Sequence, residues 1–559
     1  MDGSTNHKLI RKDDDMRAKN DVNELELYAV AGTNTVVLSL DMKNKPAGLL
    51  GFAFERKDDK TGKRIWLYGQ KCFNSVIQNP VPGQQYPTHL HPIQSFLWKD
   101  FTVKPNNPYT YKVTPVFGTP TNPEYGDSED VQVTTEPNLS GKHGIYFNRG
   151  VSGSQSYADN FGNARPDKME AAKQKLAYEW LSRGLYEGLI SFIQKAKPGQ
   201  QLRGAFYEFH YNDVLQELKN AEEKGVDVQI VYSGKSYKEE NEAAIAEVGI
   251  QNIANHLRDN EVNEPHNKFL ILCGADGKAI KVWTGSTNIS EKAIFGQCNT
   301  GHIVSDRKIA GKYLKYWQDL YTNPDRATLS GEVEDLQEDL ANTEIQDGIT
   351  VFFSPRKSVN MLQQYANLID GANEMVCCIY PFNVDKRFQA VFKEDKPFIR
   401  YILLDSHKGY NTFTTNDKDV EVTAGSYVKT PIDHWLAETS SGKIFYSGID
   451  YVHNKIIVID ALSAKPTVIT GSANYSENST TLNDENTLVI KGDTRVADIY
   501  FTEFVRLFDH FSFREWINAH KGDFKPFLDE QGTWINKYFD SNEYLSVKRK
   551  NVFKNMAIV

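Results

Sequence analysis

Two stretches of the chain decide the fold: HNKFLILCGADGKAIKVWTGSTN at His266–Asn288 and HNKIIVIDALSAKPTVITGSAN at His453–Asn474. Both begin with His-Asn-Lys and end with Gly-Ser-x-Asn, and the two histidines lie 187 positions apart, as do the two lysines. Each stretch contains two apolar runs separated by turn residues, which predicts a pair of neighbouring β-strands. A pattern repeated at one common offset indicates a duplicated structural unit.

The similarity extends upstream of both stretches. GIYFNRG is matched by ITVFFSPR, FYEFHYNDVL by IYPFNVDKRF, and VDVQIVYSG by FIRYILLDS, in the same order. Strand-like runs alternate with helix-like runs, which is typical of α/β layers. We therefore predict two homologous α/β halves, residues 139–330 and 349–559, joined by an acidic linker at 331–348. Duplicated units pack about a pseudo-twofold axis as homodimers do, which would bring the two stretches face to face.

The N-terminal part of the chain has a different pattern. Residues 23–138 carry short alternating strands with frequent Gly, Pro and Asn between them, which predicts an all-β sandwich. In FTVKPNNPYTYKVTPVFG, the alternation of Tyr109, Tyr111 and Val113 after a proline resembles the tyrosine-corner strand of a fibronectin type III-like domain. Residues 1–22 are highly charged, and we expect them to be flexible.

Composition narrows the class of protein. The 559 residues include 40% hydrophobic and 25% charged residues, as in globular proteins with several domains. The five cysteines are scattered and form no metal-binding spacing, and the N-terminus lacks an apolar secretion segment. We expect a cytoplasmic protein without a structural disulfide, a metal or another cofactor. The net charge of −9 predicts no general attraction to nucleic acid, although a local basic groove would be compatible with it.

The chemistry of the repeated stretch follows from its alternation. Along the strand that follows the histidine, His453 and Lys455 point to the same face, whereas Ser472 and Asn474 lie at the end of the next strand. The ammonium, hydroxyl and amide groups can all donate hydrogen bonds to an oxyanion. The first stretch supplies the equivalent candidates His266, Lys268, Ser286 and Asn288.

Two such sets facing each other suit a phosphodiester. One imidazole can attack phosphorus while the other protonates the leaving oxygen. The lysines and amides can stabilise the charge that develops in the transition state. This chemistry needs no metal ion.

The double HxK(x)4D and GSxN pattern resembles the phospholipase D superfamily, also called the HKD phosphodiesterases, from about residue 140 to the C-terminus. The resemblance implies two α/β halves, one active site at their seam and a covalent phosphohistidine. Many members also carry NxE eleven residues after the GSxN serine, which here gives Asn483 and Glu485. The first half departs from this pattern, because it has Gln297 and Asn299 instead.

A second departure is Cys273, which stands where the second stretch has Asp460. The position lies five residues after the lysine, an odd step along a strand, so the side chain should face away from the histidine. We interpret Cys273 as a structural residue and not as a catalytic thiol.

The asymmetry of the two halves suggests a division of labour between the histidines. A carboxylate beside an imidazole favours its protonated form. We expect Glu485 to act in this way on His453, and the neutral Asn299 to take the equivalent place beside His266. His266 would then be the nucleophile, and His453 the acid for the leaving group and later the base for water.

The sequence leaves the substrate open. The basic tail SVKRKNVFKN and the tyrosines near strand ends favour a cytosolic nuclease on DNA or RNA. Phospholipase D activity on membrane phospholipids is the alternative, although no secretion signal or amphipathic membrane helix is visible. A non-catalytic binding scaffold is the third possibility. The N-terminal sandwich is interpreted as an interaction module for a protein partner or for oligomerisation.

Overall fold

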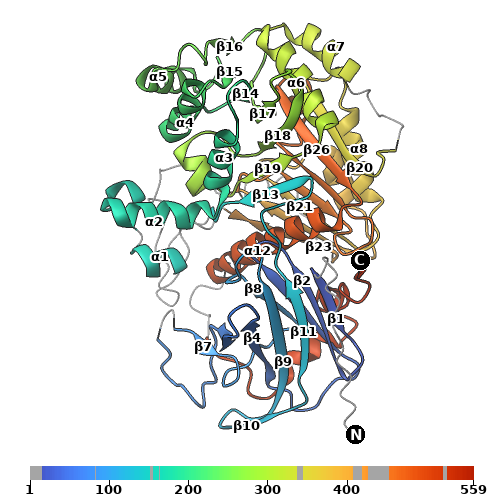
Figure 1. Ribbon diagram of the computed structural model, residues 1–559. Helices are drawn as coiled ribbons and strands as arrows, with labels where there is room; N and C mark the ends of the chain where they lie inside the picture. The colour runs from blue at the N-terminus through green and yellow to red at the C-terminus, as the bar shows by residue number, and fades with distance from the viewer. Residues whose placement is uncertain are drawn as a thin grey trace, which may run out of the picture.

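The chain folds into a β-rich N-terminal region and two α/β halves stacked above it (Figure 1). The computed structural model describes residues 16–81, 84–150, 155–162, 164–336, 344–406, 418–425, 452–519 and 526–558. No helix in these ranges is both long enough and apolar enough to span a bilayer.

The N-terminal region consists mainly of two packed sheets. One has the order β1-β2-β3-β8, and the other the order β10-β9-β4-β5 with β11 also paired to β9. Inward-facing apolar side chains from both sheets form their shared core. The strands are β1 (Arg17–Asn20), β2 (Leu25–Ala31), β3 (Val36–Met42), β4 (Gly51–Asp58), β5 (Arg64–Trp66), β6 (Tyr68–Gly69), β7 (Tyr86–Pro87), β8 (Leu97–Asp100), β9 (Pro108–Thr119), β10 (Asn122–Tyr125) and β11 (Glu129–Thr134).

Tyr109 makes the contact expected of a tyrosine corner. It lies at the start of β9 with 2% of its surface exposed, and its hydroxyl accepts a hydrogen bond of 3.0 Å from the backbone N–H of Lys104. A tyrosine at this strand position that bonds back to the preceding segment is typical of immunoglobulin-like sandwiches. The fibronectin type III-like assignment of this region stays a prediction.

The expected flexible N-terminus is wrong for part of its range. Residues 1–15 lie outside the described residues, but Arg17–Asn20 forms strand β1, which pairs antiparallel with β2. The guanidinium of Arg17 is buried against the carboxylate of Asp498, with Nη2 and Oδ1 2.8 Å apart. Charge alone predicted disorder here, whereas a buried partner 481 positions away holds the segment.

The two halves contain sheets of matching order. The first sheet runs β12-β13-β19-β18-β17-β14-β15-β16 and the second β20-β26-β25-β24-β21-β22-β23. The strands are β12 (Leu139–Ser140), β13 (His143–Phe147), β14 (Gln201–Phe206), β15 (Asp227–Ser233), β16 (His256–Arg258), β17 (Lys268–Cys273), β18 (Ala279–Gly285), β19 (Thr300–Val304), β20 (Gly348–Ser354), β21 (Met375–Tyr380), β22 (Ile399–Leu404), β23 (Val420–Ala424), β24 (Ile456–Ile459), β25 (Thr467–Gly471) and β26 (Glu485–Lys491). From β13 and β20 onward, each strand of one half has its counterpart in the other.

Helices cover the faces of these sheets. This is why the central strands β17 and β24 are buried along their whole length and read as continuous apolar runs. The α-helices are α1 (Gln155–Phe161), α2 (Ala171–Ser182), α3 (Leu185–Gln194), α4 (Asn212–Glu223), α5 (Lys238–Val248), α6 (Arg307–Tyr321), α7 (Arg326–Leu336), α8 (Asn360–Asp370), α9 (Lys386–Phe392), α11 (Glu477–Thr481), α12 (Thr494–Ala519) and α13 (Tyr544–Asn551). The described residues also form three short helical turns: η1 (Pro166–Lys168), η2 (Lys292–Gly296) and η5 (Thr533–Tyr538).

The helix after each motif ties the halves together. From α6, the hydroxyl of Tyr313 donates to Asn486 Oδ1 at 2.9 Å, and that of Tyr316 donates to the backbone oxygen of Ser354 at 2.7 Å. From α12, the Tyr500 hydroxyl lies 2.9 Å from His302 Nδ1 in the first half. These contacts cross between the halves in both directions, so the halves share one packed core.

The C-terminal tail returns to the β-rich region. Helix α13 and the residues after it place Lys550 and Lys554 against the buried carboxylate of Asp41, and Arg549 against Glu421. The Lys550 side chain is only 8% exposed, and its Nζ lies 4.1 Å from the ring centroid of Phe539. The sequence suggested a basic tail that could contact nucleic acid, but these three charges are paired with carboxylates of the protein itself.

Candidate active site

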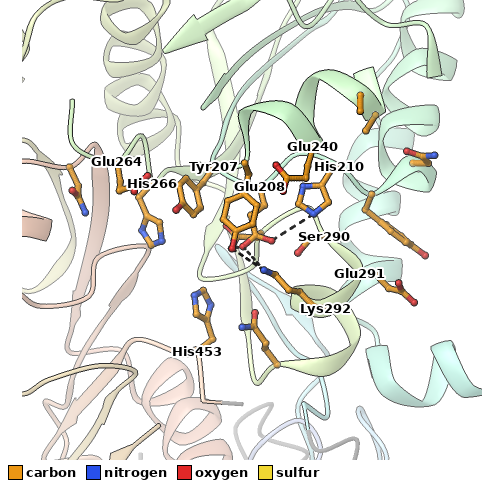
Figure 2. A pocket seen from close by; sticks show the side chains of 18 of the residues that line it. Tyr207, Glu208, His210, Glu240, Glu264, His266, Ser290, Glu291, Lys292 and His453 are labelled. Carbon is orange, nitrogen blue, oxygen red and sulfur yellow. Dashed lines mark hydrogen bonds and ion pairs between the residues drawn. The ribbon is translucent and has the colours of Figure 1, made fainter. Parts of the chain in front are cut away.

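The two motif histidines lie just before the central strand of each half. His266 precedes β17 and His453 precedes β24, and both side chains reach the seam (Figure 2). In each motif the lysine turns back and its Nζ donates a 2.7 Å hydrogen bond to the backbone oxygen of its own histidine. Both lysines are at most 1% exposed, so their positive charges sit directly behind the imidazoles.

The carboxylate of Glu485 contacts the histidine of the opposite half. Its two oxygens lie 2.9 and 3.0 Å from His266 Nδ1. Reciprocally, Asn299 Oδ1 lies 2.9 Å from His453 Nδ1. The prediction that Glu485 contacts His453, with Asn299 beside His266, is therefore wrong, and so is the argument that Glu485 favours the protonated form of His453. The prediction paired residues of the same half because they are close in sequence. In the structure, each histidine instead contacts a residue of the opposite half.

The motif serines hold these partners in place. Ser472 Oγ donates to Glu485 Oε2 at 2.7 Å, and Ser286 Oγ donates to Asn299 Oδ1 at 2.8 Å. Each serine is at most 1% exposed and stands one side chain away from an imidazole. The serines therefore hold Glu485 and Asn299 in place, and these two residues orient the histidines. The serines do not face the cavity themselves.

The hydrogen bonds at Nδ1 fix how each ring is used. An imidazole that donates its Nδ1–H to a carboxylate or amide oxygen presents Nε2 on its other side. His266 and His453 both line the cavity at the seam, so Nε2 is the ring nitrogen left for a substrate. The Glu485 carboxylate also stabilises positive charge on the ring of His266, as it would develop during attack on phosphorus.

Burial and the lysine charges set the protonation of the site. Burial, together with the charges of Lys268 and Lys455, holds the pKa of both His266 and His453 well below the usual value. Burial also lowers the pKa of Lys268 to about 7 and raises that of Glu485 to about 7. Both imidazoles are therefore neutral at pH 7 in the free protein, and an arriving anion would raise their affinity for a proton.

The region described above matches a known family. Residues 189–321 and 368–508 match the family model described as "Cardiolipin synthase, PLD-like domain". The chain belongs to the phospholipase D superfamily. The duplicated family match coincides with the two motif-bearing halves and confirms the resemblance seen in the sequence.

Several solved structures are similar to parts of this chain. The phosphatidylserine synthase of Haemophilus influenzae Rd KW20 is 12% identical, with a TM-score of 0.37 over 67% of this chain and 94% of that one. Nuc from Salmonella typhimurium, a phospholipase D family member, is 20% identical, with a TM-score of 0.20 over 30% of this chain and 96% of that one. A polyphosphate kinase from Porphyromonas gingivalis is 13% identical, with a TM-score of 0.37 over 66% and 54%. The comparison with curated proteins gives no match.

A cavity of about 970 Å³ is lined by residues of both phospholipase D motifs. Four of the predicted residues line it: His266, Asn288, His453 and Asn474. The other six lie behind them as buried supports: Lys268, Ser286, Asn299, Lys455, Ser472 and Glu485. The cavity extends from the histidines over the first half, as Figure 2 shows.

Several cavity residues escaped the motif analysis. The segment after β14 supplies Tyr207, Glu208 and His210, the turn η2 supplies Lys292, and Glu264 comes from the loop before His266. Glu208 accepts a 2.9 Å hydrogen bond from Asn288 Nδ2 and so orients a motif residue. A polar run directly after a buried strand of an α/β sheet is the signal that could have revealed Tyr207–His210.

The motif positions of Asp460 and Cys273 lie away from the histidines. The Asp460 carboxylate accepts hydrogen bonds of 2.8–3.2 Å from the backbone N–H groups of Asn373, Glu374 and Met375. It therefore fixes the turn that leads into β21. Cys273 is fully buried at the end of β17, and burial raises the pKa of its thiol to about 11.

We expect Cys273→Ser to keep most of the phosphodiesterase activity and to lower the free energy of unfolding by about 1–2 kcal/mol, because a hydroxyl replaces a thiol in an apolar site. Thiol reagents should react slowly, since little thiolate forms near neutral pH. Activity assays and denaturant titration check this, with Cys72→Ser as the matched control. A loss as large as that of His266→Ala would make Cys273 catalytic.

Within the described part of the chain, no three or more His, Cys, Asp or Glu side chains are grouped as metal ligands.

Proposed function

We propose that this protein is a phosphodiesterase that works through a phosphohistidine on His266. The contact between His266 Nδ1 and the Glu485 carboxylate, at 2.9 Å across the seam, carries this assignment. It distinguishes the two imidazoles, because His453 has the neutral Asn299 oxygen in the same position. Membership of the phospholipase D superfamily supports the reaction class.

In the first step, Nε2 of His266 attacks phosphorus and the bond to one ester oxygen breaks. Binding of the anionic phosphodiester raises the pKa of His453, whose Nε2 then takes up a proton from solvent. The departing oxygen takes this proton, so that an alcohol leaves. The carboxylate of Glu485 stabilises the positive ring of the phosphorylated His266. An imidazolium backed by an amide releases its proton more readily than one backed by a carboxylate, which suits His453 to the role of acid.

In the second step, water replaces the histidine. His453, now neutral, accepts a proton from the water as its oxygen attacks phosphorus, and the bond between His266 and phosphorus breaks. The product is a phosphomonoester, and both rings return to their starting states. Lys268, Lys455 and the amides of Asn288 and Asn474 are the groups that would stabilise the phosphoryl oxygens in both transition states.

We expect activity to be unchanged by EDTA and not to be raised by Mg²⁺ or Zn²⁺, because imidazoles supply both nucleophile and acid while lysines supply the charge. Hydrolysis of bis(p-nitrophenyl) phosphate, followed by p-nitrophenolate absorbance with and without chelator, measures this. Abolition by EDTA with recovery on adding a metal ion would exclude the proposed chemistry.

The substrate proposals are a nucleic acid, favoured by the sequence, or a membrane phospholipid. The basic tail that favoured nucleic acid is paired with Asp41 and Glu421, which removes one of its supports. A panel of single-stranded DNA, double-stranded DNA, RNA and phospholipid vesicles tests the two classes directly. Cleavage of a nucleic acid should weaken steeply with added salt, because phosphate contacts release counterions. The charges that line the cavity also affect which of these two substrate classes can bind.

A further inference from the structure

The cavity has opposite charges at its two ends. Behind the histidines lie the buried ammonium groups of Lys268 and Lys455. Among the described residues, the rest of the lining carries five carboxylates and only one lysine, Lys292. The carboxylates belong to Glu208, Glu240, Glu247, Glu264 and Glu291. A polyanion that placed one phosphate at the histidines would bring its next phosphate against these carboxylates, and like charges there oppose binding.

Two of the carboxylates lie close to the reaction centre. Glu208 follows Tyr207, whose ring centroid is 4.8 Å from that of His266. The backbone oxygen of Glu264 accepts a 2.9 Å hydrogen bond from the N–H of His266. Both negative charges act on the buried Lys268. Both carboxylates line the same cavity as His266.

These two residues and their neighbours present oxygens without partners. Glu208 Oε2, Glu264 Oε2, Asn288 Oδ1 and Ser290 Oγ are buried and form no hydrogen bond with any residue that the structure describes. All four residues line the cavity, and Glu208, Asn288 and Ser290 are at most 4% exposed. A buried acceptor without a donor is costly, so this wall is built to receive a ligand that brings several N–H donors.

Lys292 shows that the wall accepts an ammonium group. Its Nζ lies 3.1 Å from the Tyr237 hydroxyl, 3.4 Å from Glu208 Oε1 and 4.7 Å from the Tyr237 ring centroid (Figure 2). This lysine uses one oxygen of Glu208. The other oxygen, Oε2, has His210 Nε2 at 4.0 Å, beyond hydrogen-bond distance, and remains available to the cavity.

We propose that Glu208 and Glu264 form a subsite for a primary ammonium group on the alcohol esterified to the reacting phosphate. The substrate would then be a zwitterionic phosphodiester, with its phosphate at the histidines and its ammonium at the two carboxylates. A primary ammonium offers three N–H donors to the unpartnered oxygens, whereas a trimethylammonium group offers none. The inference rests on the proposed phosphodiesterase activity and names its substrate class.

Matched esters test the subsite in the unmodified protein. We expect kcat/KM for an ethanolamine phosphodiester to exceed that for the corresponding choline ester by roughly ten- to hundredfold, because each lost hydrogen bond to a charged group is costly. Glycerophosphoethanolamine and glycerophosphocholine form the water-soluble pair, and vesicles of the corresponding diacyl phospholipids form the second pair. A preference only on vesicles identifies a lipid headgroup as the source, and one in solution identifies a free phosphodiester.

Two variants connect the preference to the subsite. Glu264→Gln and Glu208→Gln should reduce the ethanolamine preference severalfold, whereas Glu239→Gln, exposed on α5 and outside the cavity lining, should not change it. Hydrolysis of bis(p-nitrophenyl) phosphate separates the two proposals, since it needs the histidines but no ammonium subsite. Activity on that ester with equal or faster cleavage of choline esters or of DNA would overturn the subsite alone. Inactivity on every ester would overturn the phosphodiesterase proposal itself.

Discussion

The His453→Ala variant should release one equivalent of p-nitrophenolate from bis(p-nitrophenyl) phosphate and then stall. p-Nitrophenolate is a good leaving group and needs no proton donor, so His266 can still attack phosphorus. Water is then not activated, because the base has been removed, and steady turnover should fall by at least roughly 10²–10⁴-fold. Stopped-flow absorbance at the enzyme concentration measures both the burst and the residual rate.

The reverse substitution should behave differently. His266→Ala removes the nucleophile, so neither a burst nor turnover is expected. His256→Ala is a matched control, because this histidine lies at the sheet edge on β16 and packs on Tyr321, outside the cavity lining. Steady turnover by His453→Ala at the unmodified rate, or an equal burst from His266→Ala, would contradict the division of labour.

Glu485→Gln should reduce kcat by roughly 10²–10⁴-fold, as expected when the residue that orients a catalytic imidazole is neutralised. The glutamine can present its amide N–H to Nδ1 of His266, which places the ring proton on Nε2 and removes the attacking lone pair. The loss should appear even with p-nitrophenyl esters, because it affects attack and not protonation of the leaving group. Steady-state and burst kinetics against pH distinguish these steps.

The same variant should be more stable at neutral and alkaline pH. Burial raises the pKa of Glu485 to about 7, above its unfolded value, so the folded state loses stability as pH rises through that interval. Glutamine removes this penalty, and we expect the free energy of unfolding to rise by about 2 kcal/mol at pH 8 with little change near pH 4. Urea titrations at both pH values measure the difference.

Glu374→Gln controls for both effects. Burial also raises the pKa of this half-buried carboxyl, but it lies beside Asp460 at the far end of β21 and outside the cavity lining. Its activity should equal that of the unmodified protein. If Glu485→Gln retains full activity, the contact at His266 Nδ1 does not activate the nucleophile.

The sequence predicted the parts of the fold that repeat. The motif stretches predicted a strand beginning at each histidine, and the strands β17 and β24 are present but begin two and three residues later, at Lys268 and Ile456. The equal offset predicted equivalent halves, and the matching order of the two sheets confirms them. Periodicity and repetition are local properties of the chain, so a single sequence reveals them.

Contacts between distant parts of the chain escaped prediction. The spacing suggested that Glu485 contacts the histidine of its own half. In the structure it contacts His266 of the other half, 219 positions away. Charge alone suggested disorder at the N-terminus and a C-terminal tail for nucleic acid, whereas Arg17 and Lys550 are buried against Asp498 and Asp41. The acidic cavity wall comes from loops and from helix α5, outside the motifs. Burial and pairing depend on tertiary structure, and residue type does not reveal them.

The most direct test of whether His266 is the nucleophile is to find which histidine carries the covalent phosphoryl group. Each single-histidine variant is mixed with bis(p-nitrophenyl) phosphate, quenched in alkali to preserve phosphohistidine, digested and analysed by peptide mass spectrometry. We expect a p-nitrophenyl phosphoryl group on His266 in the His453→Ala protein and no adduct in the His266→Ala protein. An adduct on His453 in the His266→Ala protein, with none on His266 in the other variant, would contradict it.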